Sequence, residues 1–144
     1  MYEYRTKVVR VIDGDTVDVD IDLGFGVWLR KSRIRLLGVD TPESRTRDKE
    51  EKKYGLAAKA FLKKSLGTNP ILKTTKDGKG KFGRILGEFI VEVADQDEFL
   101  HQNHMQRISI NELLIDNHHA VRYMGQSKDD IAEQHLVNRE LVKL

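Results

Sequence analysis

Apolar and polar residues alternate near the start of the chain in a pattern typical of β-strands. Over residues 16–23, valine, isoleucine and leucine side chains point to one face and polar side chains to the other. Residues 4–12 and 27–38 are also rich in apolar and β-branched residues, and Asp13-Gly14 is a dipeptide that favours a hairpin turn. These segments predict a β-meander.

The spacing of apolar residues then changes from strand-like to helical. Residues 44–53 are almost all polar, so we expect a surface loop that leads into a helix from Tyr54 to about Gly67. Two further strands are predicted on either side of a glycine-rich loop: residues 70–76 and 84–93, with the loop at 77–83.

The last third of the chain carries two helix-start signals. Residues 94–107 are polar and show no clear period, whereas Ser109 and Glu112 fit a capping box that opens a helix to about residue 118. Ser127 resembles the cap of a final helix. Residues 1–144 therefore predict a single α+β domain, mainly β, in which a five-stranded Greek-key barrel of the OB type carries three helices.

Composition narrows the functional classes. The chain has 144 residues, of which 39% are hydrophobic and 33% charged, and its net charge of +2 does not by itself indicate a nucleic-acid partner. Cysteine is absent, which excludes disulfides, thiolate metal sites and a cysteine nucleophile. No long apolar run predicts a membrane-spanning helix, and the first residues do not resemble a signal peptide, so we expect an intracellular protein without a membrane partner.

Three carboxylates stand at predicted strand ends. Asp15 shares the parity of the core-facing valines, where a carboxylate is costly unless it is paired or binds metal, although an Asx turn would also explain it. Asp40 and Glu43 flank Thr41-Pro42, and the proline keeps Thr41 extended. Such oxygen ligands suit Ca²⁺ or Mg²⁺, and Glu43 could instead act as a general base; turn or helix-entry acids remain the simpler alternative.

Two arginines accompany these acids. Arg35 lies on the third predicted strand and Arg84 opens a later one, and guanidinium groups match phosphate oxygens bidentately. Either arginine could also be an ordinary surface cation. Three other acids, Asp18, Asp20 and Asp22, are expected on the solvated face of a strand, and His135 is expected to be structural.

In combination, these segments resemble the staphylococcal nuclease (thermonuclease) family. The matching stretches occur in the family's order and are residues 12–16, 35–43, 53–55, 82–84, 111–112 and 133–136. The resemblance implies an OB-fold barrel with three helices that hydrolyses DNA and RNA with Ca²⁺ and leaves 3′-phosphate ends.

The resemblance also implies a role for each matched residue. Asp15 and Asp40 would bind Ca²⁺ through their carboxylates and Thr41 through its carbonyl, while Glu43 would be the general base. Arg35 and Arg84 would bind phosphate, and Arg84 would also assist the leaving 5′-oxygen. Two further positions, Lys81 and Tyr123, match residues near the terminal phosphate and base of a bound nucleotide.

The chain departs from the family pattern in places that concern substrate binding. Phe82 and Gly125 stand at or near tyrosine positions, the loop before Arg84 is shorter, and residues 94–107 look like an insertion. These departures concern substrate affinity and terminal-phosphate recognition rather than the reaction class. We expect a monomeric nuclease that prefers single-stranded or frayed regions. The alternatives are a non-catalytic nucleic-acid or protein-binding module on the same fold, and a scaffold that docks a partner through residues 94–107.

Overall fold

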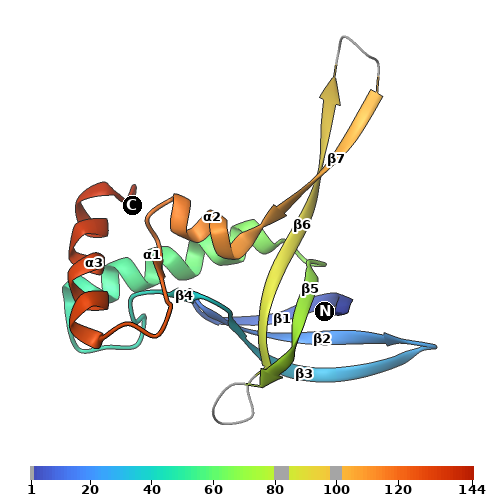
Figure 1. The fold of residues 1–144 in the computed structure, drawn as a ribbon, viewed down its shortest axis with the longest axis horizontal. Coiled ribbons are helices and arrows are strands. Elements are labelled where there is room, and N and C mark those ends of the chain that lie inside the picture. Colours follow the sequence, from blue (N-terminus) through green and yellow to red (C-terminus); the bar gives the residue numbers. More distant parts are fainter. Residues whose placement is uncertain (1, 80–84, 98–101) are drawn as a thin grey trace.

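The computed structural model describes residues 2–79, 85–97 and 102–144 (Figure 1). In chain order the elements are β1 (Tyr2–Asp13), β2 (Thr16–Gly24), β3 (Val27–Leu36), β4 (Val39–Asp40), α1 (Lys49–Leu66), β5 (Ile71–Lys79), β6 (Ile85–Asp97), β7 (Gln102–Ser109), α2 (Ile110–Asp116), β8 (Val121–Arg122) and α3 (Lys128–Leu141). Within these described residues, no helix is long and apolar enough to cross a membrane.

Five of the strands close into a barrel. β1 pairs with β2 and β5, β2 pairs with β3, and β5 pairs with β6, all antiparallel. The parallel pairing of β3 with β6, from Ile34↔Ile85 to Leu36↔Gly87, closes the ring. The described residues thus form a closed five-stranded barrel with three helices, which confirms the predicted fold class.

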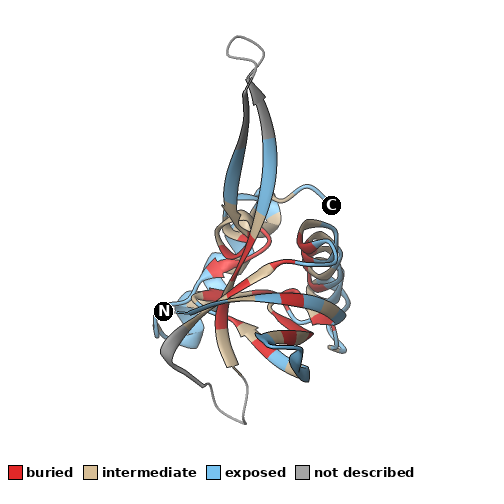
Figure 2. Ribbon diagram, turned by 90° about the vertical axis from the view of Figure 1, so that its right-hand side faces the viewer, coloured by how far each residue is buried: buried red, intermediate tan, exposed pale blue. Residues whose placement is uncertain are grey.

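Alternation along the strands fills the barrel interior. The fully buried side chains come from both halves of the chain and include Val17, Val19, Ile34, Leu36, Leu72 and Phe89. Leu62 and Leu66 of α1 and Ile110 and Leu114 of α2 join the same cluster. Figure 2 shows this buried layer where strands and helices face one another. Among the described residues, strands and helices thus share one hydrophobic cluster.

Helix α1 begins earlier than the apolar pattern predicts. Asp48 is its N-cap and accepts hydrogen bonds from the backbone N–H groups of Glu50 and Glu51 at 3.1 and 3.2 Å. The expected loop over 44–53 therefore ends at the cap. The first turns consist of lysine and glutamate, which favour helix without any apolar face to reveal it.

The segment 94–107 forms strand rather than irregular chain. β6 continues to Asp97 and pairs antiparallel with β7 from Ile90↔Ser109 to Asp97↔Gln102. The two strands form a hairpin that projects from the barrel (Figure 1). The side chains described at positions 92–94 and 105–107, Val93 and Met105 among them, are exposed, so this described part of the hairpin buries no face that would impose alternation on the sequence.

A second, two-stranded sheet was not predicted. Val39 pairs with Arg122 and Asp40 with Val121, so β4 and β8 hold the chain immediately before Thr41 against the segment that follows α2. Two residues per strand are too few to give a sequence signal. This pairing places Asp40 and Tyr123 on neighbouring backbones.

Candidate active site

Asp15 and Arg35 are brought together by the pairing of β2 with β3. Thr16 is the register partner of Arg35, and the Leu36 N–H donates to the Asp15 carbonyl at 2.8 Å. The Arg35 Nη2 atom consequently lies 3.4 Å from Asp15 Oδ2. A turn residue of one strand and an end residue of the next thus form one ion pair.

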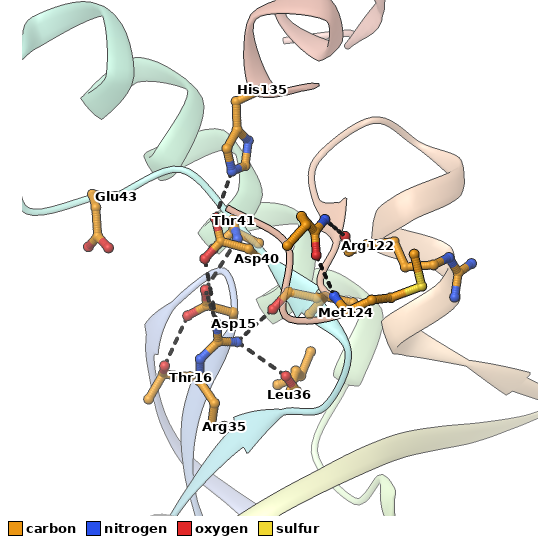
Figure 3. Close-up of polar contacts among 12 residues, drawn as sticks. Asp15, Thr16, Arg35, Leu36, Asp40, Thr41, Glu43, Arg122, Met124 and His135 are labelled. Carbon is orange, nitrogen blue, oxygen red and sulfur yellow. Dashed lines mark hydrogen bonds and ion pairs between the residues drawn. The ribbon is translucent and has the colours of Figure 1, made fainter. Parts of the chain in front are cut away.

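The guanidinium of Arg35 is held from several directions (Figure 3). Its Nη1 donates to the carbonyl oxygens of Leu36 at 3.1 Å and Val39 at 2.9 Å. Its Nη2 lies 3.6 Å from Asp40 Oδ1, and the side chain is only 18% exposed. Arg35 is therefore an oriented, partly buried charge rather than an ordinary surface cation.

The contacts of Asp15 exceed those of a simple turn residue. Its Oδ1 accepts from the hydroxyl of Thr16 at 3.0 Å, and its Oδ2 accepts from the backbone N–H of Thr41 at 3.2 Å. The second contact joins residues 26 apart in the sequence. The Asx-turn alternative accounts for neither that contact nor the approach of Arg35.

Asp40 is shared between Arg35 and the C-terminal helix. Its Oδ2 lies 2.7 Å from His135 Nε2 of α3, while its Oδ1 faces Arg35. Since a carboxylate oxygen accepts, the Nε2 atom donates in this contact. His135 is the residue at this site that sequence reasoning missed, because nothing in the local pattern of a helix reveals a contact across 95 positions.

Thr41 contributes buried polar atoms. The residue is only 4% exposed, and among the described residues its Oγ1 finds no hydrogen-bond partner. A Cβ on Gly14 would meet this hydroxyl at 2.9 Å, so the turn after β1 lies directly against Thr41. The three predicted calcium ligands, Asp15, Asp40 and Thr41, therefore lie within one contact network.

The oxygen atoms of this site suit a hard cation that is bound by few protein ligands. Two carboxylates face the same Arg35 nitrogen, and the predicted ligands Asp15, Asp40 and Thr41 all offer oxygen, as Ca²⁺ and Mg²⁺ prefer. In the described ranges, no three or more histidine or acidic side chains are grouped as a metal cage. A cation here would keep water molecules in its coordination shell.

Glu43 lies on the loop between β4 and α1 (Figure 3). Burial raises the pKa of its carboxyl, and the negative charges of Asp13, Asp15, Asp40 and Glu51 raise it further. A carboxylate with a raised pKa is a stronger proton acceptor when it is ionised. A raised pKa is one property that suits a general base.

Gly55 allows α1 and the loop that carries Glu43 to approach closely. A Cβ on Gly55 of α1 would collide with the carbonyl group of Glu43 and the backbone nitrogen of Ser44. Ser44 also donates its hydroxyl to Asp13. The loop that carries Glu43 is consequently clamped between α1 and the β1–β2 turn.

A cleft of about 550 Å³ opens over these residues. Asp40, Thr41 and Glu43 line one side, and α3 lines the other with Lys128, Ile131, Ala132, His135, Leu136 and Arg139. Tyr123, predicted to bind substrate, also lines this cleft and is 47% exposed. The predicted residues Lys81 and Arg84, together with Phe82, lie outside the residues that the structure describes.

The expectation for the aspartates of β2 is wrong in one case. Asp18 is only 6% exposed, because Arg33 covers it and donates from Nε and Nη2 at 2.9 and 3.2 Å. The acid lies on the outward face, as predicted, but an arginine from the next strand shields it from water.

The family model described as staphylococcal nuclease homologue matches residues 33–142, which is more than half of the chain. The chain belongs to this family. Its thermonuclease relatives include that of Staphylococcus intermedius, 41% identical over 80 residues, and that of Staphylococcus hyicus, 38% identical over 85 residues. Endonuclease YhcR of Bacillus subtilis is 32% identical over 97 residues.

These alignments cover parts of each protein. They include 55% and 58% of this chain for the two thermonucleases, and 44% and 47% of those relatives. For YhcR they include 62% of this chain and 8% of the relative. The chain thus matches less than half the length of the two thermonucleases. Membership of the staphylococcal nuclease homologue family confirms the resemblance predicted from the sequence motifs.

Proposed function

We propose that this chain is a Ca²⁺-dependent nuclease that hydrolyses phosphodiester bonds of DNA and RNA and leaves 3′-phosphate ends. The observation that carries the proposal is the arrangement of Arg35 between Asp15 and Asp40, beside a Glu43 whose pKa is raised. Family membership and the thermonuclease relatives support the same reaction class.

The charge of the site supports the proposed role of a cation. Asp15, Asp40 and Glu43 outnumber the single guanidinium of Arg35, so the described site is net negative and repels a phosphodiester. Asp15, Asp40 and the Thr41 carbonyl would hold Ca²⁺, which supplies the positive charge that polarises a phosphoryl oxygen. With the carboxylates neutralised, Arg35 is free to attract the substrate phosphate.

Glu43 would act on the attacking water. It accepts a proton from the water as the water oxygen bonds to phosphorus, and the bond between phosphorus and the 5′-oxygen breaks. Arg35 and Arg84 stabilise the negative charge that develops on the phosphoryl oxygens. The 5′-oxygen takes a proton from solvent water as it leaves, and Glu43 returns its proton to solvent, which gives a 5′-hydroxyl and a 3′-phosphate.

The substrate would be a single strand or a frayed end. The cleft between Glu43 and α3 is lined by Tyr123, which offers an aromatic face to a base. Lys81 would contact a terminal phosphate. We expect the protein to act as a monomer.

The decisive experiment is cleavage of single-stranded DNA with Ca²⁺, with EDTA, and with the Glu43→Gln variant in Ca²⁺. We expect cutting only for the unmodified protein in Ca²⁺, with 3′-phosphate ends on the products. Loss of a preorganised charged group costs about 3–4 kcal/mol of transition-state stabilisation, or two to three orders of magnitude in rate. A folded protein that binds the strand and never cuts it would instead be a binding module.

A further inference from the structure

A row of cationic side chains, made of Arg35, Arg33 and Arg30, follows the outer face of β3 away from the candidate active site. Ile34 and Leu36 are buried in the barrel, so Arg33 and Arg35 point outward by strand alternation. Arg33 contacts Asp18, which is the register partner of Arg33 on β2. The row therefore begins at the candidate active site and continues along the strand.

A bulge keeps the next arginine on the same face. The register shifts between Val19↔Ser32 and Ile21↔Leu29, and Lys31 has a positive φ of 54°. An extra residue in one strand reverses the faces of the residues beyond it. Arg30 accordingly reaches Asp20, its Nη1 atom 3.0 Å from Asp20 Oδ2.

Each arginine of the row is anchored on one side and open on the other. The side chains of Arg30 and Arg33 are 66% and 51% exposed, whereas those of their partners Asp20 and Asp18 are 14% and 8% exposed. Asp20 is fixed in turn by the backbone N–H of Lys31 at 2.8 Å. The acids thus orient the guanidinium groups, whose remaining N–H groups face water.

An aromatic side chain extends the row. Trp28 is the register partner of Asp22 and is 37% exposed. The guanidinium carbon of Arg30 lies over its ring, 5.2 Å from the ring centroid. Side chains on one face of a strand are spaced by about 6.6–6.8 Å. Trp28, Arg30, Arg33 and Arg35 therefore occupy successive positions from the hairpin to the site.

Further cations border this face. Lys7 and Arg10 on β1 are the register partners of Asp20 and Asp18, and directly opposite residues of paired strands share a face. Both are exposed. The two acids are therefore flanked by cations from β1 and from β3, so this part of the surface is net positive although the whole chain is nearly neutral.

We infer that the outer face of β3 binds single-stranded nucleic acid beyond the phosphodiester that reacts, with phosphates on Arg33 and Arg30 and a base on Trp28. Guanidinium groups held in a fixed orientation suit phosphate oxygens, and an exposed indole stacks on bases of any sequence. The inference rests on the proposed function for its choice of ligand, because the row ends at Arg35.

Trp28 provides a direct test, since it is the only tryptophan of the chain. The probe is an oligothymidylate of about ten nucleotides, titrated into the full chain in EDTA while tryptophan fluorescence is recorded. The row contains no proposed metal ligand, so binding to it persists when cleavage is blocked. We expect saturable quenching by the single strand and much weaker quenching by a duplex of the same length.

Paired substitutions keep the net charge constant. Arg33→Gln with Asp18→Asn removes one anchored guanidinium, and we expect affinity to fall roughly fivefold to tenfold and the salt slope to decrease by about 0.7. Arg107→Gln with Glu3→Gln is the matched control, because it removes an exposed ion pair on β7 and β1. Arg30→Gln with Asp20→Asn repeats the test at a more exposed pair.

The outcomes separate this inference from the proposed function. Absence of tryptophan quenching, or equal losses in the row and control variants, would overturn the binding surface even if the protein cuts DNA. Quenching that the row variants weaken, in a protein that never cuts, would retain the surface and remove the nuclease.

Discussion

At the level of single residues, His135 shows how a distant side chain controls the orientation of a site acid. Its Nε2 is 2.7 Å from Asp40 Oδ2, which leaves Oδ1 facing Arg35. Replacing His135 by alanine should free the Asp40 carboxylate to rotate and reduce cleavage or Ca²⁺ affinity by about 10–100-fold. Calorimetric titration of Ca²⁺ and turnover measurements check this.

Two comparisons define the cause of that loss. Gln134→Ala removes an exposed neighbour on the same helix and should leave both readouts near their original values. His135→Gln retains an N–H donor and should recover part of the Ca²⁺ affinity. Equal effects of Gln134→Ala and His135→Ala would mean that α3 as a whole, and not this contact, is responsible.

The raised pKa of Glu43 predicts a pH-dependent stability difference. Its ionised form is disfavoured in the folded protein, so its contribution to stability is present below the unfolded pKa and is lost as pH rises through the folded pKa. Glu43→Gln should therefore raise Tm at neutral pH in EDTA, and the gain should shrink toward acid pH. Thermal melts of both proteins over this range measure the difference.

Glu112 gives a control of opposite sign. Its hydrogen bonds to Arg122 lower its pKa, so its contribution is present above the unfolded pKa and is lost as pH falls through the folded pKa. Glu112→Gln should lower Tm slightly at neutral pH, with the loss fading in acid. If both variants shifted Tm in the same direction, the electrostatic explanation for Glu43 would fail.

At the level of elements, the position of Glu43 depends on the approach of α1. A methyl group at Gly55 would collide with the Glu43 carbonyl, so Gly55→Ala should displace the loop. We expect a loss of about 1–3 kcal/mol in unfolding free energy from the overlap, reduced by the roughly 1 kcal/mol gain in helix propensity, together with lower turnover. Ser65→Ala in the same helix is the comparison. Urea unfolding and cleavage assays on both variants measure the difference between them.

The elements also show which features of the fold a sequence can reveal. Strand β2 was predicted because it buries one face, which imposes alternation on its sequence, while β1 and β3 were predicted from their apolar and β-branched residues and the turns that bound them. The described hairpin side chains at 92–94 and 105–107 and those in the first turns of α1 are mostly exposed, so these polar sequences predicted an irregular segment and a loop.

The residues of the candidate site also divide into those that the sequence reveals and those that it does not. Arg35, Asp40 and Glu43 were identified because they gather near a strand end within residues 35–43, and Asp15 because it shares the parity of the core-facing valines. The contact of His135 with Asp40 and the shielding of Asp18 by Arg33 both join different elements. Residue types alone do not reveal such contacts. Tertiary proximity is the information that the linear pattern lacks.

At the level of the whole molecule, the barrel and the projecting hairpin should be separable. Closure of the barrel uses β6 only from Ile85 to Ile90, while the hairpin pairs β6 and β7 from Ile90↔Ser109 outward. Replacing residues 93–106 by Asn-Gly would join Glu92 to Arg107 through a two-residue turn suited to an antiparallel pair. The shortened chain should therefore fold with its core intact.

The same deletion tests whether residues 94–107 serve as a scaffold. All the described residues proposed for the reaction lie outside the hairpin, so we expect the shortened protein to keep its cleavage rate within about twofold, as is usual for changes remote from a site. Light scattering should give the same oligomeric state before and after deletion. A change of that state with unaltered cleavage would assign the hairpin to assembly, because the barrel alone would then account for catalysis and the hairpin for the contact between chains.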